Sequence, residues 1–295
     1  MSTNRSHHPA DTTDLVASAL TVHTQAIASR SIGKGQPLLL CLRLRGVMDV
    51  WDLAVLEALA ETFTVITFDS RGLDQWTGTP SDDRAALARD AKELADALGL
   101  DKVFMARYPE RTSHTILIGT VPPGAQPSQA EPIFLPTALK PHATREDEYV
   151  LCFESESTCS GAAGKTSYER SAARTGNCSP EIPEETSLRL VQASHDDQAV
   201  FPDHAGYADV LASTAIPLLV LSGDHDIVFP VGNWYALNRT WKSLHIMTFP
   251  QAGHRPQHPF PEVCADVIAR CVRNVREGTT TMACTDHARV MALQV

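Results

Sequence analysis

The chain has 295 residues, 43% hydrophobic and 20% charged, with a formal net charge of -10 at pH 7. This hydrophobic content can fill a sizeable core and excludes a disordered protein. The negative charge argues against nucleic acid and anionic membrane surfaces as partners, and no run approaches the roughly 18 apolar residues that span a bilayer.

The cysteines and the first residues predict where the protein resides. Seven cysteines show no C-x-x-C spacing, and their odd number argues against a disulfide framework, so we expect the reducing cytoplasm. Residues 1–13 are polar and lack the apolar region of a signal peptide, which predicts a flexible tail. A small molecule is the expected partner, and the oligomeric state is left open.

The front part alternates apolar runs with amphipathic segments. We expect strands at 37–42 and 63–68, and helices at 50–60 and 82–98, the second capped by Ser81 and ended by Gly99. This alternation predicts an α/β fold with a mostly parallel sheet flanked by helices.

The rhythm breaks between residues 121 and 213 and then returns. The middle stretch combines Pro-rich and Ser-rich pieces with helix-like segments at 146–153 and 160–174, and we interpret it as a helical lid insertion. Strands at 216–221 and 244–249 follow, with helices at 232–239 and 262–276. The expected parts are a tail (1–13), a first core part (14–120), the lid (121–213), a second core part (214–276) and a loose C-terminal tail (277–295).

Asp226 and His254 are the main candidate site residues. Each comes just after one of the last two predicted strands, and the ends of parallel neighbours meet at one edge of the sheet, where ligands of open α/β sheets bind. An Asp there can accept one imidazole N–H and leave the other nitrogen as a general base. Asp224 is a rival acid, and the alternative is a turn-forming Asp with a polar loop His.

Several short segments together carry a resemblance to a known family. They are Arg43–Asp52 (R-L-R-G-V-M-D-V-W-D), Phe68–Gly72 (F-D-S-R-G), Tyr108–Arg111, Ile118–Thr120, Gly223–Asp226 with Pro230, and Ala252–His254. In this order they resemble the α/β-hydrolase fold family over about residues 14 to 275.

The resemblance implies a hydrolase and assigns roles to further residues. The backbone N–H groups of Leu44 and Arg45 would form one side of an oxyanion hole, and the family register favours Asp226 over Asp224. Arg43 stands where many relatives have His. Arg43 and Arg45 are alternatively carboxylate or enolate binders, or ordinary solvated or salt-bridged arginines.

The nucleophile of the family is missing. No G-x-S-x-G occurs in the chain, so neither the serine nor the second oxyanion donor that follows it is present. Only residues 107–112 separate the apolar runs 102–106 and 114–118, whereas adjacent parallel strands need a crossover of roughly a dozen residues. We expect a lost or displaced central strand, with Val103–Met105 in a loop or helix extension. A wrong exon assignment that removed about 15 to 20 residues is the other explanation.

Other chemistry is weakly indicated. Cys41, Ser70 and Ser222 follow or end predicted strands but occupy no nucleophile elbow, and His225, Asp226, His254 and His258 match no metal motif. We therefore expect no metal and no cofactor.

Three functions remain open at this point. The first is hydrolysis of an ester, lactone or related carbonyl compound, for which the kind of relatives that the chain resembles suggests a role in secondary metabolism. The second is small-molecule binding by a non-catalytic pseudo-hydrolase. The third is isomerisation or cyclisation by an Asp-His base. Whether the chain is an enzyme is left open.

Overall fold

The structure is a computed structural model that describes most of the chain. The described residues are 16–22, 25–42, 46–74, 76–81, 83–100, 112–124, 127–140, 144–154, 157–173, 182–195, 203, 206–276 and 290–294. The expected tail at 1–13 and the apolar run at 102–106 lie outside them.

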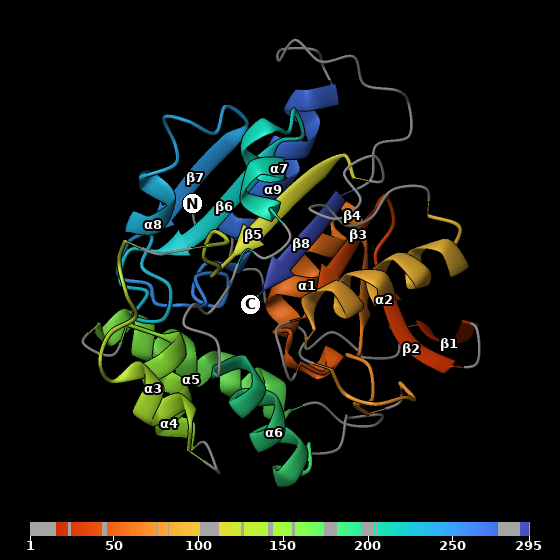
Figure 1. The fold of residues 1–295 in the computed structure, drawn as a ribbon, viewed down its shortest axis with the longest axis horizontal. Helices are drawn as coiled ribbons and strands as arrows, with labels where there is room; N and C mark the ends of the chain where they lie inside the picture. The colour runs from red at the N-terminus through yellow and green to blue at the C-terminus, as the bar shows by residue number, and fades with distance from the viewer. Residues whose placement is uncertain are drawn as a thin grey trace, which may run out of the picture.

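The described residues form one eight-stranded sheet in the order β1-β2-β4-β3-β8-β5-β6-β7 (Figure 1). The strands are β1 (Val16–Val22), β2 (Gln25–Ile32), β3 (Gln36–Cys41), β4 (Phe63–Phe68), β5 (His114–Ile118), β6 (Leu218–Gly223), β7 (Leu244–Phe249) and β8 (Val290–Gln294). The pairs from β4 to β7 are all parallel, and β1 and β2 add an antiparallel hairpin at one edge. The expected mostly parallel α/β sheet is confirmed.

Strand β8 occupies the middle of the sheet, although we expected residues 277–295 to form a loose tail. Ala292 is in register with Leu40 of β3 on one side and with Ile116 of β5 on the other. Both neighbours would otherwise present unpaired backbone N–H and C=O groups toward each other, and β8 satisfies both rows. The expectation of a tail was therefore wrong for residues 290–294.

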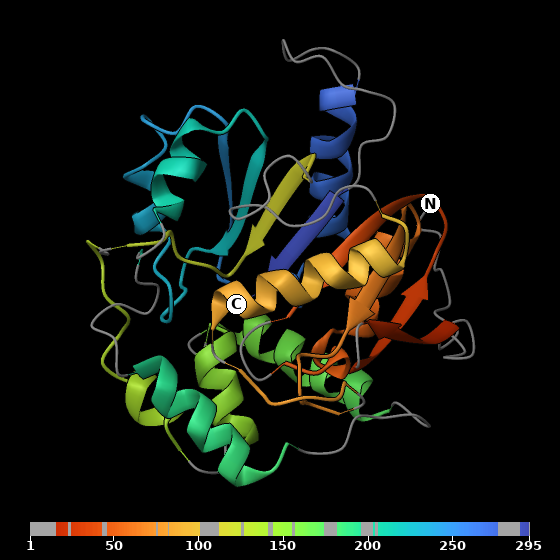
Figure 2. The same cartoon turned by 45° about the vertical axis from the view of Figure 1, so that its right-hand side comes forward.

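The helices lie on both faces of the sheet and in a separate block (Figures 1 and 2). They are α1 (Leu53–Ala60), α2 (Arg84–Ala97), α3 (Phe134–Ala138), α4 (Arg145–Cys152), α5 (Thr158–Ala172), α6 (Glu184–His195), α7 (Tyr207–Ser213), α8 (Gly232–Tyr235) and α9 (Pro261–Arg276). A 3-10 helix, Met48–Val50, precedes α1.

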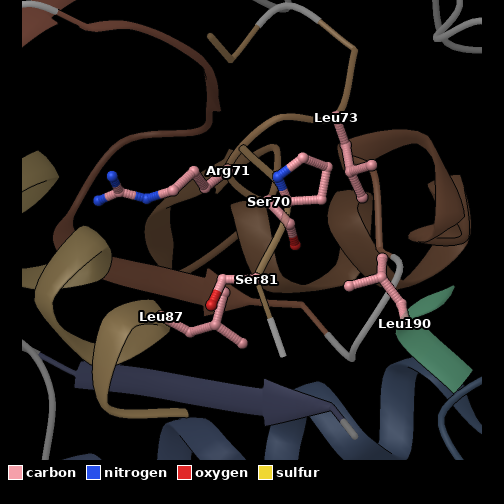
Figure 3. A pocket seen from close by; sticks show the side chains of 7 residues that line it. Ser70, Arg71, Leu73, Ser81, Leu87 and Leu190 are labelled. Atoms are coloured by element: carbon pink, nitrogen blue, oxygen red, sulfur yellow. The ribbon is translucent and has the colours of Figure 1, made fainter. Parts of the chain in front are cut away.

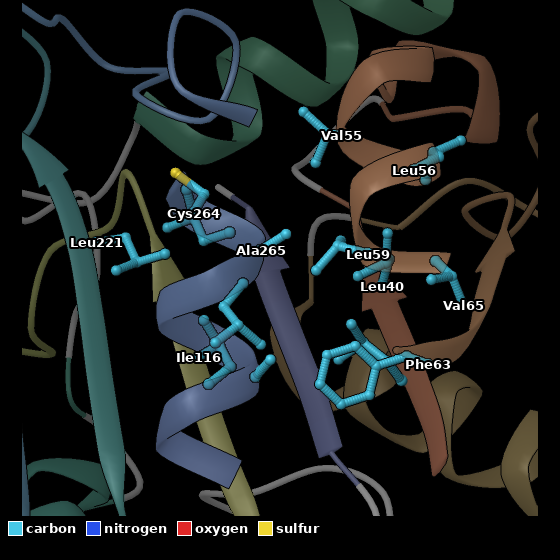
Figure 4. Close-up of a cluster of buried hydrophobic side chains, with 14 of the residues drawn as sticks. Leu40, Val55, Leu56, Leu59, Phe63, Val65, Ile116, Leu221, Cys264 and Ala265 are labelled. Atoms are coloured by element: carbon cyan, nitrogen blue, oxygen red, sulfur yellow. The ribbon is translucent and has the colours of Figure 1, made fainter. Parts of the chain in front are cut away.

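Side chains of β3 alternate between two cores. Leu38 and Leu40 belong to the cluster with α1 and α9, which Figure 4 shows, and Leu39 and Cys41 pack toward α2. This alternation follows from the two-residue period of a strand buried on both faces. Helices α1 and α9 lie on the same face of the sheet. The crossover from β3 to β4 through α1 and the crossover from β7 to β8 through α9 also move in the same direction along the sheet. The two crossovers therefore have the same hand.

Aspartates set the starts of two core helices. Asp52 accepts a hydrogen bond from the Ala54 N–H at 3.0 Å, so α1 begins at Leu53 rather than at residue 50. Asp83, and not the expected Ser81, caps α2 by accepting from the Ala85 N–H at 2.8 Å. The Ser81 hydroxyl instead accepts from the Asp83 N–H just outside the helix.

The middle segment forms a helical block beside the strand ends, where Figures 1 and 2 show α3 to α6. The expected helices at 146–153 and 160–174 correspond to α4 and α5. Helix α7 lies within the expected lid boundaries, yet its Leu211 packs with Leu218 and Trp234 against the sheet. This apolar contact places α7 in the core layer.

Two elements of the second core part differ from expectation. Helix α8 ends at Tyr235 instead of continuing to residue 239, because backbone bonds such as Thr240 N–H to Leu237 C=O continue the chain in turns. Strand β6 begins at Leu218, after Pro217. Among the helices in the described ranges, none has the length and apolar character required to cross a membrane.

Candidate active site

Asp226 and His254 meet at the carboxyl edge of the sheet. Asp226 follows β6 and His254 follows β7, and these neighbouring strands are parallel. His254 Nδ1 lies 3.0 Å from Asp226 Oδ2, and both side chains are buried. The topology predicted from the sequence thus brings the two groups into direct contact.

The backbone fixes the Asp226 carboxylate. Its Oδ1 accepts hydrogen bonds from the Val228 and Phe229 N–H groups, each at 2.9 Å, which leaves Oδ2 directed at His254. The rival, Asp224, is turned elsewhere: its Oδ1 lies 2.6 Å from His225 Nδ1 and accepts from the Ala252 N–H at 3.3 Å. Asp226, and not Asp224, is therefore the partner of His254.

The His254 ring is held by contacts on two sides. The ring of Phe229 meets it edge-on, with centroids 5.3 Å apart. Gly119, just after β5, lies so close that a Cβ there would come within 2.3 Å of the His254 carbonyl oxygen and 3.3 Å of Nδ1. A carboxylate at Nδ1 favours the tautomer with the proton on that nitrogen, so the basic lone pair resides on Nε2.

The turn after β4 supports the neighbouring loop. Asp69 Oδ1 accepts from the Met48 N–H at 2.9 Å, and the Ser70 N–H donates to the Gly46 C=O at 3.3 Å. Burial raises the pKa of Asp69 to about 7, with Asp74 adding repulsion. The predicted oxyanion residues Arg43, Leu44 and Arg45 lie outside the described residues, immediately before this supported segment.

Two of the three alternative nucleophiles, Cys41 and Ser222, are buried. Cys41 is buried at the end of β3, and burial raises the pKa of its thiol, which keeps it protonated. Ser222 is fully buried, and its hydroxyl donates to the Gly223 C=O at 3.3 Å.

Ser70 lines a pocket near the same edge (Figure 3). The other residues around it are Arg71, Leu73, Pro80, Ser81, Leu87 and Leu190. Leu190 comes from α6, so the helical block reaches the turn after β4 here.

The four residues weighed as metal ligands do not form a metal centre. Within the described ranges, no group of three or more His, Cys, Asp or Glu side chains is arranged to hold a metal ion. Asp226 and His254 are engaged with each other, whereas His258 contacts a different partner, Ser167 Oγ, at 2.6 Å.

A second polar group near this edge was not predicted from the sequence. Asp52, Ser167, Arg170 and His258 come together where α5 meets the sheet domain. Asp52 and Arg170 are 118 positions apart, and no local pattern links them. The only available signal was Asp52 as an acidic residue before an apolar run, which marks a helix N-cap.

A mostly parallel sheet with this strand order, with an Asp after β6 and a His after β7, defines the class: the chain has the α/β-hydrolase fold. No protein-family model matches the sequence, and no curated protein matches it either. Solved structures match along nearly their full length.

Three such structures illustrate the likeness. An α/β hydrolase fold protein from Chitinophaga pinensis is 21% identical with a TM-score of 0.73, over 88% of this chain and 97% of its own. A bacterial membrane phospholipase A is 18% identical with a TM-score of 0.66, over 89% and 87%. The 2-hydroxy-6-oxo-6-phenylhexa-2,4-dienoate hydrolase of a Rhodococcus species is 14% identical with a TM-score of 0.65, over 88% and 99%.

Proposed function

We propose that this protein is a hydrolase in which the Asp226–His254 pair acts as a general base on a small ester, lactone or related carbonyl compound. The observation that carries the proposal is the 3.0 Å contact between His254 Nδ1 and Asp226 Oδ2 at the carboxyl edge of the sheet. The fold supports it, because solved structures with the same fold include a phospholipase and a 2-hydroxy-6-oxo-6-phenylhexa-2,4-dienoate hydrolase. A small molecule is the proposed partner.

In the proposed reaction, water is the nucleophile. His254 Nε2 takes a proton from water while Asp226 stabilises the imidazolium that forms, and the hydroxide oxygen bonds to the carbonyl carbon. The bond from that carbon to the leaving oxygen then breaks, and the imidazolium returns its proton to that oxygen, which yields an acid and an alcohol. The N–H groups of Leu44 and Arg45 are the proposed donors to the oxyanion.

Two observations favour water over a covalent nucleophile. The sequence contains no G-x-S-x-G. The thiol of Cys41 is buried with a raised pKa, and the hydroxyl of Ser222 is buried and hydrogen-bonded to the backbone. A base that acts on water needs neither group.

The test measures hydrolysis of p-nitrophenyl acetate and of a short lactone by the purified full chain. His254→Ala and Asp226→Asn should each lower kcat/KM by about 100-fold or more, since positioned general bases contribute roughly 10² to 10⁴ in rate. Asp224→Asn is the matched control and should retain the wild-type rate, because Asp224 contacts His225 instead. A fluorophosphonate probe should label no serine. Full activity of His254→Ala, or labelling of any serine, would contradict the proposal.

A second function uses the same pair without hydrolysis. The absence of an elbow nucleophile in the sequence equally favours proton abstraction beside a carbonyl, as in an isomerisation or cyclisation. Deuterium from heavy water would then enter the carbon next to the carbonyl, and His254→Ala would abolish this exchange. If the protein binds such compounds but catalyses neither hydrolysis nor this exchange, its function is small-molecule binding.

A further inference from the structure

A polar cluster, buried except for the partly exposed Arg170, joins helix α5 to the sheet domain. The Arg170 guanidinium donates to Asp52 through Nε, at 2.7 Å from Oδ1, and through a terminal nitrogen, at 2.5 Å from Oδ2. Ser167, on the same helix, places its Oγ 2.6 Å from His258 Nδ1, and that nitrogen lies 3.6 Å from Asp52 Oδ2. We refer to Asp52, Ser167, Arg170 and His258 as the Asp52 cluster.

Arg170 and His258 stabilise the buried carboxylate of Asp52. The Asp52 side chain is 0% exposed. Burial alone would raise the pKa of Asp52, but the hydrogen bond from Arg170 and the attraction of His258 outweigh burial and hold that pKa below its usual value. Because Asp52 also caps α1 through the Ala54 N–H, one carboxylate ties the start of α1 to the end of α5.

The geometry differs from that of a catalytic Ser-His-Asp triad. In a triad, the serine and the aspartate engage opposite nitrogens of the imidazole, so that the proton taken from one side is compensated on the other. Here Ser167 and Asp52 both face Nδ1 of His258. The bidentate arginine also neutralises the carboxylate. The arrangement is suited to holding elements together.

The Asp52 cluster includes a residue of the turn that carries His254. His254 and His258 lie in the same connection between β7 and α9. The Arg255 N–H donates to the Cys152 C=O of α4 at 3.0 Å. Gly253 packs so tightly on this block that a Cβ there would lie 2.7 Å from the Phe153 carbonyl carbon.

Phe153 completes the link between the helical block and this turn. Its ring meets the His258 ring edge-on, with centroids 5.9 Å apart, and a Cβ at Gly164 of α5 would lie 3.1 Å from it. The turn from Gly253 to His258 is thus held by α4 on one side and by the Asp52 cluster on the other.

We propose that the Asp52 cluster is a clamp that fixes the helical block on the sheet domain and thereby positions His254 against Asp226. Asp52, Ser167, Arg170 and His258 are positioning residues in this view. The consequence for catalysis rests on the proposed function, whereas the consequence for the geometry of the Asp226–His254 pair does not.

The test compares Arg170→Ala and Ser167→Ala with Lys165→Ala in the full chain. Lys165 lies on the same helix, and its ion pair with Glu169, at 3.9 Å, is exposed on both sides, so its loss should change nothing measurable. Hydrogen exchange of the α5 amides and the NMR resonance of the His254 Nδ1 proton report the two parts of the clamp without any substrate.

The clamp predicts that Arg170→Ala speeds amide exchange in α5 by about tenfold or more and shifts or broadens the His254 resonance. Ser167→Ala is a smaller change and should speed the exchange and shift the His254 resonance to a lesser degree. If Arg170→Ala does not fold, Ser167→Ala tests the clamp in its place. Guanidinium ion added to Arg170→Ala, or the variant Arg170→Lys, should restore part of the resonance, because each returns a cation to Asp52.

Faster exchange in α5 with an unchanged His254 resonance would overturn the positioning role, and unchanged exchange would overturn the clamp. If the protein turns over the ester, kcat should fall in the Arg170 variant more than KM rises. If the wild type shows no turnover, the proposed function fails, while the resonance and the exchange rates still decide on the clamp.

Discussion

Asp69 shows how one buried carboxyl group responds to its surroundings. Oδ1 accepts from the Met48 N–H, while Oδ2 is buried and has no hydrogen-bond partner within the described residues. Burial raises the pKa to about 7, so the protonated form is favoured in the folded chain. The residue that holds the loop after β3 therefore titrates near neutral pH.

The pH dependence of stability should reveal this carboxyl group. Between pH 4 and 7 the folded state binds the Asp69 proton more tightly than the unfolded state, whose pKa is near 3.8, so this residue costs stability as the pH rises. The difference in unfolding free energy between Asp69→Asn and wild type should move in favour of the variant between pH 4 and 8, by at most about 4 kcal/mol. Urea titrations across this range measure it, and parallel pH curves for the two proteins would refute it.

Sequence reasoning found the residues whose placement follows from topology alone. Asp226 and His254 each come just after a parallel strand, so their meeting at one edge could be predicted. The Asp52 cluster could not, because its ion pair joins residues 118 positions apart, and only the packing of α5 on the sheet domain brings them together. His258 was weighed only as a metal ligand, since nothing in its neighbours in the sequence indicates Ser167.

The connection after β5 limits where His254 can lie. Gly119 has a φ of 54°, and its Cα faces the His254 backbone. A side chain there is disfavoured both by the left-handed backbone conformation and by the lack of space.

Gly119→Ala should therefore destabilise the fold by more than Gly99→Ala. Gly99 has a similar φ of 65°, but among the described residues no atom beyond its own chain neighbours lies within 4 Å of the position that a Cβ would take, so its substitution costs only backbone strain, about 1 to 2 kcal/mol. We expect Gly119→Ala to cost at least about 1 kcal/mol more and to displace His254. Thermal unfolding and the His254 Nδ1 proton resonance check this, and equal effects of the two substitutions would count against it.

Elements with a clear hydrophobic period were predicted well, and those without one were not. Strands β4 and β7 have the expected bounds, and α2 and α9 agree to within two residues at each end. The hairpin of β1 and β2 was missed, because its strands are rich in Ala and Ser and the residues between them, His23 and Thr24, are not the Asn-Gly type that signals a tight turn.

The sheet depends on a strand from a distant part of the chain. Strand β8 pairs with β3 and β5 and so connects the half of the sheet that contains β4 to the half that contains β6. A strand between two neighbours uses its backbone groups on both sides, which makes it sensitive to proline.

Ala292→Pro should consequently disrupt the fold. Proline has no N–H to donate and a fixed φ, so it removes a ladder hydrogen bond from a central strand, and we expect an insoluble protein or a clearly lower urea midpoint. Ala292→Gly keeps the N–H and should cost only about 1 kcal/mol. If Ala292→Pro unfolds at the wild-type midpoint, β8 does not have the central position.

The sequence predicted the class of fold but not this pairing. The spacing of the apolar runs at 102–106 and 114–118 indicated a disturbance in the centre of the sheet, while nothing local in residues 290–294 indicated a strand. β8 pairs where it does because β3 and β5 each have a row of backbone N–H and C=O groups that needs a partner. These strands lie far from β8 in the sequence, so no short stretch of sequence contains both partners of the pairing.

The position of β8 also sets an order of events during synthesis on the ribosome. Residues 118 and 290, the end of β5 and the start of β8, are 172 positions apart. At typical translation rates of 5 to 20 residues per second, the ribosome would take roughly 10 to 30 s to synthesise the residues from the end of β5 to the start of β8. Throughout that interval the two halves of the sheet expose facing edges, so chaperones that shield strand edges have a longer task here than for a protein whose middle strand is made early.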